Sequence, residues 1–106
     1  MTFDYTTAKW RHLSAAVMRR DGYLCQQAKR YGRRTPAEVV HHIFPAETYP
    51  QYALCAWNLI ALSRAEHNKL HDRDSHRLTA EGVAMMERLM RKGYPPSPED
   101  KNTLAL

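Results

Sequence analysis

Cysteines and long apolar runs are both scarce in this chain. Its 106 residues include only two cysteines, Cys25 and Cys55, so we do not expect a secreted scaffold held together by several disulfides. No apolar run approaches the roughly 18 residues that a membrane-spanning helix needs, and the N-terminal residues lack the apolar core of a signal peptide. We therefore expect a soluble protein of the cytoplasm.

Acidic residues are outnumbered by basic ones. Sixteen lysines and arginines stand against eleven aspartates and glutamates, which gives a formal net charge of +5. Most of the cations are arginines, which bind phosphate through paired hydrogen bonds. A nucleic-acid partner fits this balance, although the same charge can simply keep a protein soluble.

The length predicts a single domain with a modest core, which we assign to 1–93. Periodicity and capping signals predict a helix at each end of it. The first helix is expected at 6–20, with an apolar face of Trp10, Leu13, Ala16 and Val17. The last helix is expected from Thr79 to Gly93, with an apolar stripe of Val83, Met86, Leu89 and Met90. A proline-containing tail at 94–106 is expected to be extended or disordered.

Two short strands and a further helix are predicted between the terminal helices. A β-branched run at 38–44 and an apolar run at 58–62 are typical of neighbouring strands. Ser63 is a good N-cap, and Glu66 three residues later gives a capping-box pattern. The helix that begins there is expected to end near 72–74.

Four of the six histidines fall inside this central segment. His41 and His42 are adjacent in the first predicted strand, whereas His67 and His71 lie four residues apart in the predicted helix. Imidazoles at that spacing share one helix face, so both can bind one ion, and a strand histidine can supply a third ligand. Three imidazoles leave open positions on the ion, as in catalytic metal sites. The remaining histidine can act as a base beside a metal-bound phosphate.

The order of these residues resembles the His-Asn-His motif of the HNH endonucleases. The resemblance rests on HH at 41–42, NL at 58–59 and EHNKLH at 66–71. An upstream VMRRDGYLCQ segment is similar to the lead-in of phage and bacterial HNH domains, so the match covers about 17–73. It implies an α+β fold with a ββα-metal core at 38–73, flanked by an N-terminal and a C-terminal helix.

The resemblance also implies a role for each residue of the motif. His41, His67 and His71 match the metal ligands, and His42 matches the general base that activates water. Asn58 matches the middle residue, which holds the base-bearing loop. The implied reaction is hydrolysis of a DNA phosphodiester to 5′-phosphate and 3′-hydroxyl ends. Neighbours on a regular strand point to opposite faces, so His41 and His42 can cooperate only if the phosphate bridges them or the strand is distorted.

The chain departs from the family pattern at the cysteines. Many HNH domains carry two CxxC pairs that bind a structural zinc around the active site. Here only Cys25 remains of the first pair, and Ser63 and Glu66 stand where the second pair would fall. We therefore expect no structural zinc, and the capping box is a plausible replacement worth about 1 kcal/mol.

Several cations are candidate contacts to DNA phosphates, with solvated surface as the competing interpretation. They are Arg19, Arg20, Arg33, Arg34, Arg64, Lys69 and Arg73. Arg19 and Arg20 can equally serve the C-terminal dipole of the first helix. Arg33 and Arg34 belong, with Lys29 and Arg30, to a cluster of cations around Gly32 that we interpret as an exposed loop. His71 can also be a surface residue.

The function that these observations favour is a divalent-metal-dependent endonuclease acting on DNA. The sequence does not choose among Mg²⁺, Mn²⁺, Ni²⁺ and Zn²⁺ as the ion. A non-catalytic module that binds metal and nucleic acid, and a purely structural metal site, are the alternatives. A phage origin and a link to phage packaging proteins are expected by analogy alone, in which case the protein acts in the host cytoplasm.

Overall fold

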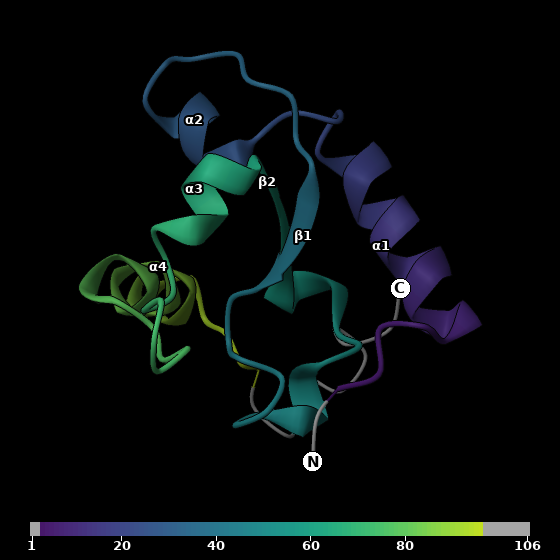
Figure 1. The fold of residues 1–106 in the computed structure, drawn as a ribbon. Coiled ribbons are helices and arrows are strands. Elements are labelled where there is room, and N and C mark those ends of the chain that lie inside the picture. The colour runs from purple at the N-terminus through teal and green to yellow at the C-terminus, as the bar shows by residue number, and fades with distance from the viewer. Residues whose placement is uncertain (1–2, 97–106) are drawn as a thin grey trace.

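Two antiparallel strands lie at the centre of the molecule, with helices on both sides (Figure 1). The structure is a computed structural model that describes residues 3–96. Strands β1 (Val39–His42) and β2 (Leu59–Leu62) are joined through two short 3₁₀ turns, η1 (Pro50–Tyr52) and η2 (Ala56–Asn58). The helices are α1 (Ala8–Arg20), α2 (Gln26–Arg30), α3 (Arg64–Asn68) and α4 (Ala80–Arg91). The predicted order of strand, loop, strand and helix is confirmed.

The register of the two strands places one apolar cluster on each face of the sheet. His41 pairs with Ile60, and His42 pairs with Leu59. Leu59 packs with the apolar face of α1, whereas Leu62 packs with α2, α4 and the segment after α3. Figure 1 shows the same division, with α1 on one side of the strands and α2, α3 and α4 on the other.

The first helix begins and buries the face that its sequence predicts. The Thr7 side chain accepts a hydrogen bond from the Trp10 N–H, and Trp10, Leu13 and Val17 are buried. Gly22 follows the last turn with a φ of +65°, a left-handed conformation that glycine adopts without a steric cost.

The predicted basic loop is in part a helix, α2. The Cys25 sulfur accepts from the Ala28 N–H at its start. At its end, the Arg33 N–H bonds to the Ala28 carbonyl and the Gly32 N–H to the Lys29 carbonyl, with Gly32 at a φ of +79°. This is the Schellman arrangement that glycine favours after a helix, so the prediction of a loop at Lys29 was wrong.

The C-terminal helix starts at its predicted cap but buries a different face. Thr79 accepts from the Gly82 N–H, and Met85 is buried, with Met86 and Leu89 packed against the core. Val83 and Met90 are exposed, so the predicted stripe was wrong at these two positions. Residues 97–106 of the predicted tail lie outside the described residues. Across residues 3–96, no helix combines the length and apolar character needed to cross a membrane.

Candidate metal and catalytic site

Three histidines converge between β1 and the segment that begins with α3. The His41 ring centroid lies 5.1 Å from that of His67 and 5.3 Å from that of His71, and the two latter centroids are 5.3 Å apart. One ring nitrogen from each lies within 4.8 Å of the others. In the part of the chain that the structure describes, this is the group of side chains that could hold a metal ion.

His71 reaches this group from outside the helix that was predicted to carry it. Helix α3 ends at Asn68, and the Leu70 N–H bonds back to the His67 carbonyl, one residue short of α-helical spacing. His71 instead forms an isolated β-bridge with Leu78. The predicted helix end near 72–74 was therefore wrong, although the two histidines still meet.

The start of α4 determines where the chain leaves α3. The Thr79 hydroxyl donates to the Lys69 carbonyl at 2.7 Å, and the Thr79 N–H donates to the Leu70 carbonyl at 2.9 Å. A Cβ on Gly82 would lie 2.6 Å from that same Leu70 oxygen, so only glycine allows α4 to approach this closely. These contacts fix the backbone next to His71.

Two of the three imidazoles, those of His41 and His67, are held in the neutral form that a metal ligand needs. Burial lowers the pKa of His41 well below its usual value, and the neighbouring His67 and His71 lower it further. Burial likewise lowers the pKa of His67, with His71 and Arg64 acting in the same direction. A neutral imidazole keeps a lone pair on one nitrogen, as a metal ligand requires.

The donor set fits a divalent ion. His41 is 2% exposed, and its Nε2 is a buried polar atom without a hydrogen-bond partner within residues 3–96. The His76 carbonyl can only accept from His71 Nδ1, at 3.3 Å, which leaves His71 Nε2 free as a donor to metal. Nitrogens bound at about 2.1 Å to one ion lie roughly 3.4 Å apart in tetrahedral geometry. Shifts of about 1 Å therefore complete the site.

His42 lies on the opposite face of β1, as strand alternation predicts. Its Nε2 is 2.9 Å from the Ala53 carbonyl oxygen. A carbonyl only accepts, so Nε2 carries the proton and Nδ1 keeps its lone pair. Burial lowers the pKa of His42, an effect that the hydrogen bond to Ala53 opposes. The side chain is thus held as a neutral base.

Both strand histidines nevertheless line one pocket. It has a volume of about 260 Å³, and all four residues of β1 contribute to its lining. The lining residues are Tyr5, Val39, Val40, His41, His42, Pro45, Ala46, His67 and His71. A pocket lined by both histidines is what a phosphate that bridges them requires.

Three aromatic side chains pack against His42, and no signal in the sequence predicted this. Trp10 stacks on the imidazole with centroids 5.0 Å apart and planes at 19°. Phe3 and Tyr5 meet it edge-on, at 5.1 and 6.0 Å. The sequence interpretation assigned Trp10 to core packing and left Phe3 and Tyr5 unassigned, because no spacing rule links an N-terminal aromatic to a histidine on a strand.

Asn58 holds the loop that follows His42. It is fully buried, and its Oδ1 accepts from the Phe44 N–H at 2.7 Å. Its Nδ2 donates to the Phe44 carbonyl at 3.0 Å and to the Tyr52 carbonyl at 3.2 Å. Tyr52 precedes Ala53, whose carbonyl orients His42. One amide therefore connects both ends of the loop to the base.

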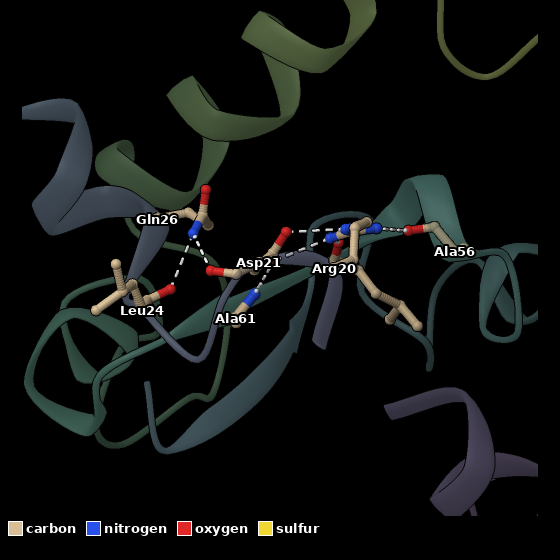
Figure 2. A network of polar contacts seen from close by, with 7 residues as sticks. Arg20, Asp21, Leu24, Gln26, Ala56 and Ala61 are labelled. Carbon is tan, nitrogen blue, oxygen red and sulfur yellow. Dashed lines mark hydrogen bonds and ion pairs between the residues drawn. The ribbon is translucent and has the colours of Figure 1, made fainter. Parts of the chain in front are cut away.

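The Arg20 side chain forms an ion pair and hydrogen bonds within the protein. Its guanidinium pairs with Asp21 at 2.8 Å and donates to the carbonyls of Ala56 and Leu59. Asp21 also accepts from the Ala61 N–H at 2.9 Å (Figure 2). This network joins the end of α1 to β2 and η2, so we do not carry Arg20 forward as a phosphate contact.

The other predicted phosphate contacts differ in what they touch. Arg33 and Lys69 both pair with the Glu66 carboxylate, at 3.1 and 3.3 Å. Glu66 thus forms ion pairs, and of the predicted capping box only the bond from the Glu66 N–H to Ser63 is found within the described residues. The remaining four predicted contacts are exposed and take part in none of the ion pairs found between residues 3 and 96. They are Arg19, Arg34, Arg64 and Arg73.

Comparisons with known proteins give one close structural match. The chain is similar to the HNH endonuclease of the deep-sea thermophilic bacteriophage GVE2, a crystal structure solved with a manganese ion. The two are 34% identical with a TM-score of 0.59, over 60% of this chain and 70% of the phage enzyme. No family model and no curated protein matches the chain.

Proposed function

Because this chain belongs to the HNH endonuclease family and has its ββα-metal fold, we propose that it is a divalent-metal-dependent endonuclease that hydrolyses DNA phosphodiester bonds. The observation that carries the proposal is the pocket in which the three-histidine cluster and the neutral base His42 meet. The phage source of the similar enzyme also supports a phage origin for this one. An association with phage packaging proteins remains part of the proposal by analogy alone.

In this proposal His41, His67 and His71 hold the ion. The chemistry that a divalent ion supplies there is polarisation of the phosphate and stabilisation of charge on the leaving 3′-oxygen. Since all three ligands are neutral, they leave the positive charge of the site uncompensated, which suits an anionic substrate. The GVE2 structure contains manganese, and manganese is accordingly the first ion to test.

His42 acts as the general base. Its Nδ1 takes a proton from the attacking water. The water oxygen forms a bond to phosphorus, and the bond between phosphorus and the 3′-oxygen breaks. The 3′-oxygen then takes a proton from solvent, which leaves 5′-phosphate and 3′-hydroxyl ends. The Ala53 carbonyl keeps Nε2 protonated throughout, and Asn58 and Trp10 hold the ring in position.

Plasmid nicking tests this assignment. Supercoiled plasmid is incubated with Mn²⁺, Mg²⁺, Ni²⁺ or Zn²⁺, with an EDTA control, and metal affinity is measured by calorimetry. We expect His42→Ala to lose about 10²–10⁴-fold in nicking rate while it keeps its metal affinity. His67→Ala should lose both. His12→Ala, an exposed histidine on α1, should lose neither.

Two results would contradict the proposal. A wild-type protein that nicks DNA with none of the ions, yet binds metal and DNA, would be the non-catalytic binding module. Equal loss of metal affinity in His42→Ala and His67→Ala would show that the assignment of base and ligand is wrong.

A further inference from the structure

A second cleft, larger than the histidine pocket, lies between α2, α4 and the base of β2. Its volume is about 590 Å³, and it shares no lining residue with the histidine pocket. Besides Arg20, its lining carries four cations: Lys29 and Arg30 from α2, Arg88 from α4, and Lys92, the residue that follows α4. Its floor is apolar and aromatic, formed by Ile43, Trp57, Ile60, Leu89 and Tyr94.

The charge of this cleft is uncompensated. The acid in its lining is Asp21, and Asp21 is already paired with Arg20. None of the four wall cations belongs to an ion pair within residues 3–96. Burial lowers the pKa of Arg88, and the nearby Arg30 lowers it further, as expected where like charges are crowded. An anionic ligand would relieve this repulsion.

The aromatic residues of the cleft indicate which class of anionic ligand it fits. Trp57 and Tyr94 stack with ring centroids 5.1 Å apart and planes at 23°, and both line the cleft. Cations placed around aromatic rings are typical of grooves for single-stranded nucleic acid, where phosphates meet the cations and bases stack on the rings. An acidic peptide would engage the cations alone, and the bases of a duplex are covered by their own stacking.

We propose that this cleft binds a single-stranded segment of nucleic acid, with its phosphates on the α2 and α4 cations and a base on the Trp57–Tyr94 floor. The choice of nucleic acid as the anion rests on the proposed function. Two lining residues of the cleft adjoin the catalytic residues in sequence: Ile43 follows His42, and Trp57 precedes Asn58. The cleft therefore gives the enzyme a second contact to its substrate, away from the scissile phosphate.

Binding of fluorescent oligothymidylate of about 12 nucleotides to the full chain, in EDTA and across a salt series, tests this proposal. The test variant is Arg88→Gln/Lys92→Gln. Loss of two phosphate contacts should reduce the slope of log affinity against log salt by about 1.4. The matched control is Lys9→Gln/Arg11→Gln, which removes one lysine and one arginine from exposed positions on α1, outside the cleft. It should retain the wild-type slope.

The opposite wall provides an independent variant. Lys29→Gln/Arg30→Gln should reproduce the reduced slope, and it decides the question if the α4 variant fails to fold by circular dichroism. Equal slopes in cleft and control variants would overturn the proposal, since binding would then depend on net charge alone. Competition by polyglutamate as effective as that by oligothymidylate would also overturn it, in favour of an acidic protein partner.

Plasmid nicking by the wild type, run in parallel with a divalent ion, separates this proposal from the proposed function. Nicking together with unchanged oligonucleotide binding in both cleft variants refutes the cleft and leaves the nuclease assignment intact. Absence of nicking together with the reduced slope refutes the nuclease assignment and supports the cleft.

Discussion

Replacing Asn58 by alanine should damage the fold and the catalytic site together. The substitution removes three hydrogen bonds to backbone groups of Phe44 and Tyr52. Asn58 is 0% exposed, so water cannot replace these bonds. A net loss of about 1 kcal/mol per bond predicts a decrease of about 3 kcal/mol in the free energy of unfolding. That is a large share of the 5–15 kcal/mol typical of a small domain.

Urea unfolding followed by circular dichroism, in EDTA, measures this decrease without a contribution from bound metal. Asn68→Ala is the matched control, because Asn68 is exposed on α3 and should change the unfolding free energy by less than about 0.5 kcal/mol. Asn58→Asp separates hydrogen bonding from volume. It keeps the shape and one acceptor but cannot donate to the two carbonyls, so it should destabilise at least as much as alanine.

Asn58→Ala should also nick DNA more slowly than the loss of folded protein alone explains. Loss of the bond to Tyr52 frees the segment whose next residue, Ala53, orients His42. Nicking is therefore compared at a temperature where unfolding curves show the variant to be folded. An unfolding free energy within 0.5 kcal/mol of wild type, or wild-type nicking by the folded variant, would refute the role that we give to Asn58.

Three further outcomes are expected. Trp10→Phe should lower the turnover rate of nicking roughly 10- to 100-fold with little change in KM for DNA, because the indole ring that stacks on His42 is removed. A change confined to KM would contradict this. Gly82→Ala should destabilise the protein by about 2 kcal/mol in urea unfolding and weaken metal binding in calorimetry, since its Cβ would clash with the Leu70 carbonyl next to a ligand. Manganese at about 100 times its dissociation constant should stabilise the fold by about 2.7 kcal/mol, seen as a higher melting temperature, and His67→Ala should abolish that shift.

Elements with local signals were predictable from the sequence. The Thr7, Ser63 and Thr79 caps each lie one residue before a helix that the structure contains. The two strands were predicted within two residues because β-branched and apolar runs mark them directly. The strand-loop-strand-helix order predicted that a strand histidine would meet His67 and His71, and the choice of His41 over His42 came from the family resemblance.

Features set by tertiary contacts were not predictable in this way. The end of α3 at Asn68 was not predictable locally, because Thr79, eleven residues further along the chain, bonds to the carbonyls of Lys69 and Leu70 that follow the helix. The buried face of α4 is likewise set by the close approach of Gly82 to Leu70, which brings Met85 inward in place of Val83. The sequence could not identify the partners of Arg20, because two of them are backbone carbonyls of residues distant in the chain, and every residue has such a carbonyl.

Helix caps occupy the positions where other HNH domains carry their two cysteine pairs. Cys25 and Ala28 occupy the i and i+3 positions of one CxxC pair, and Ser63 and Glu66 occupy those of the other. In both places the first side chain accepts a hydrogen bond from the N–H three residues later, so each turn persists as a helix cap. One thiol among these four positions cannot form the tetrahedral sulfur set of a structural zinc.

The two caps also remain in contact with each other. Burial raises the pKa of the Cys25 thiol, but the neighbouring Ser63 and Ala28 lower it overall, and Cys25 and Ser63 are both buried. Glu66 adds ion pairs to Arg33, which follows α2, and to Lys69, which precedes the His71 segment. The link between α2 and α3 that a zinc ion would provide is thus made by two caps and a shared carboxylate. Because Glu66 directly precedes His67, this link fixes the turn of α3 that carries the proposed second metal ligand.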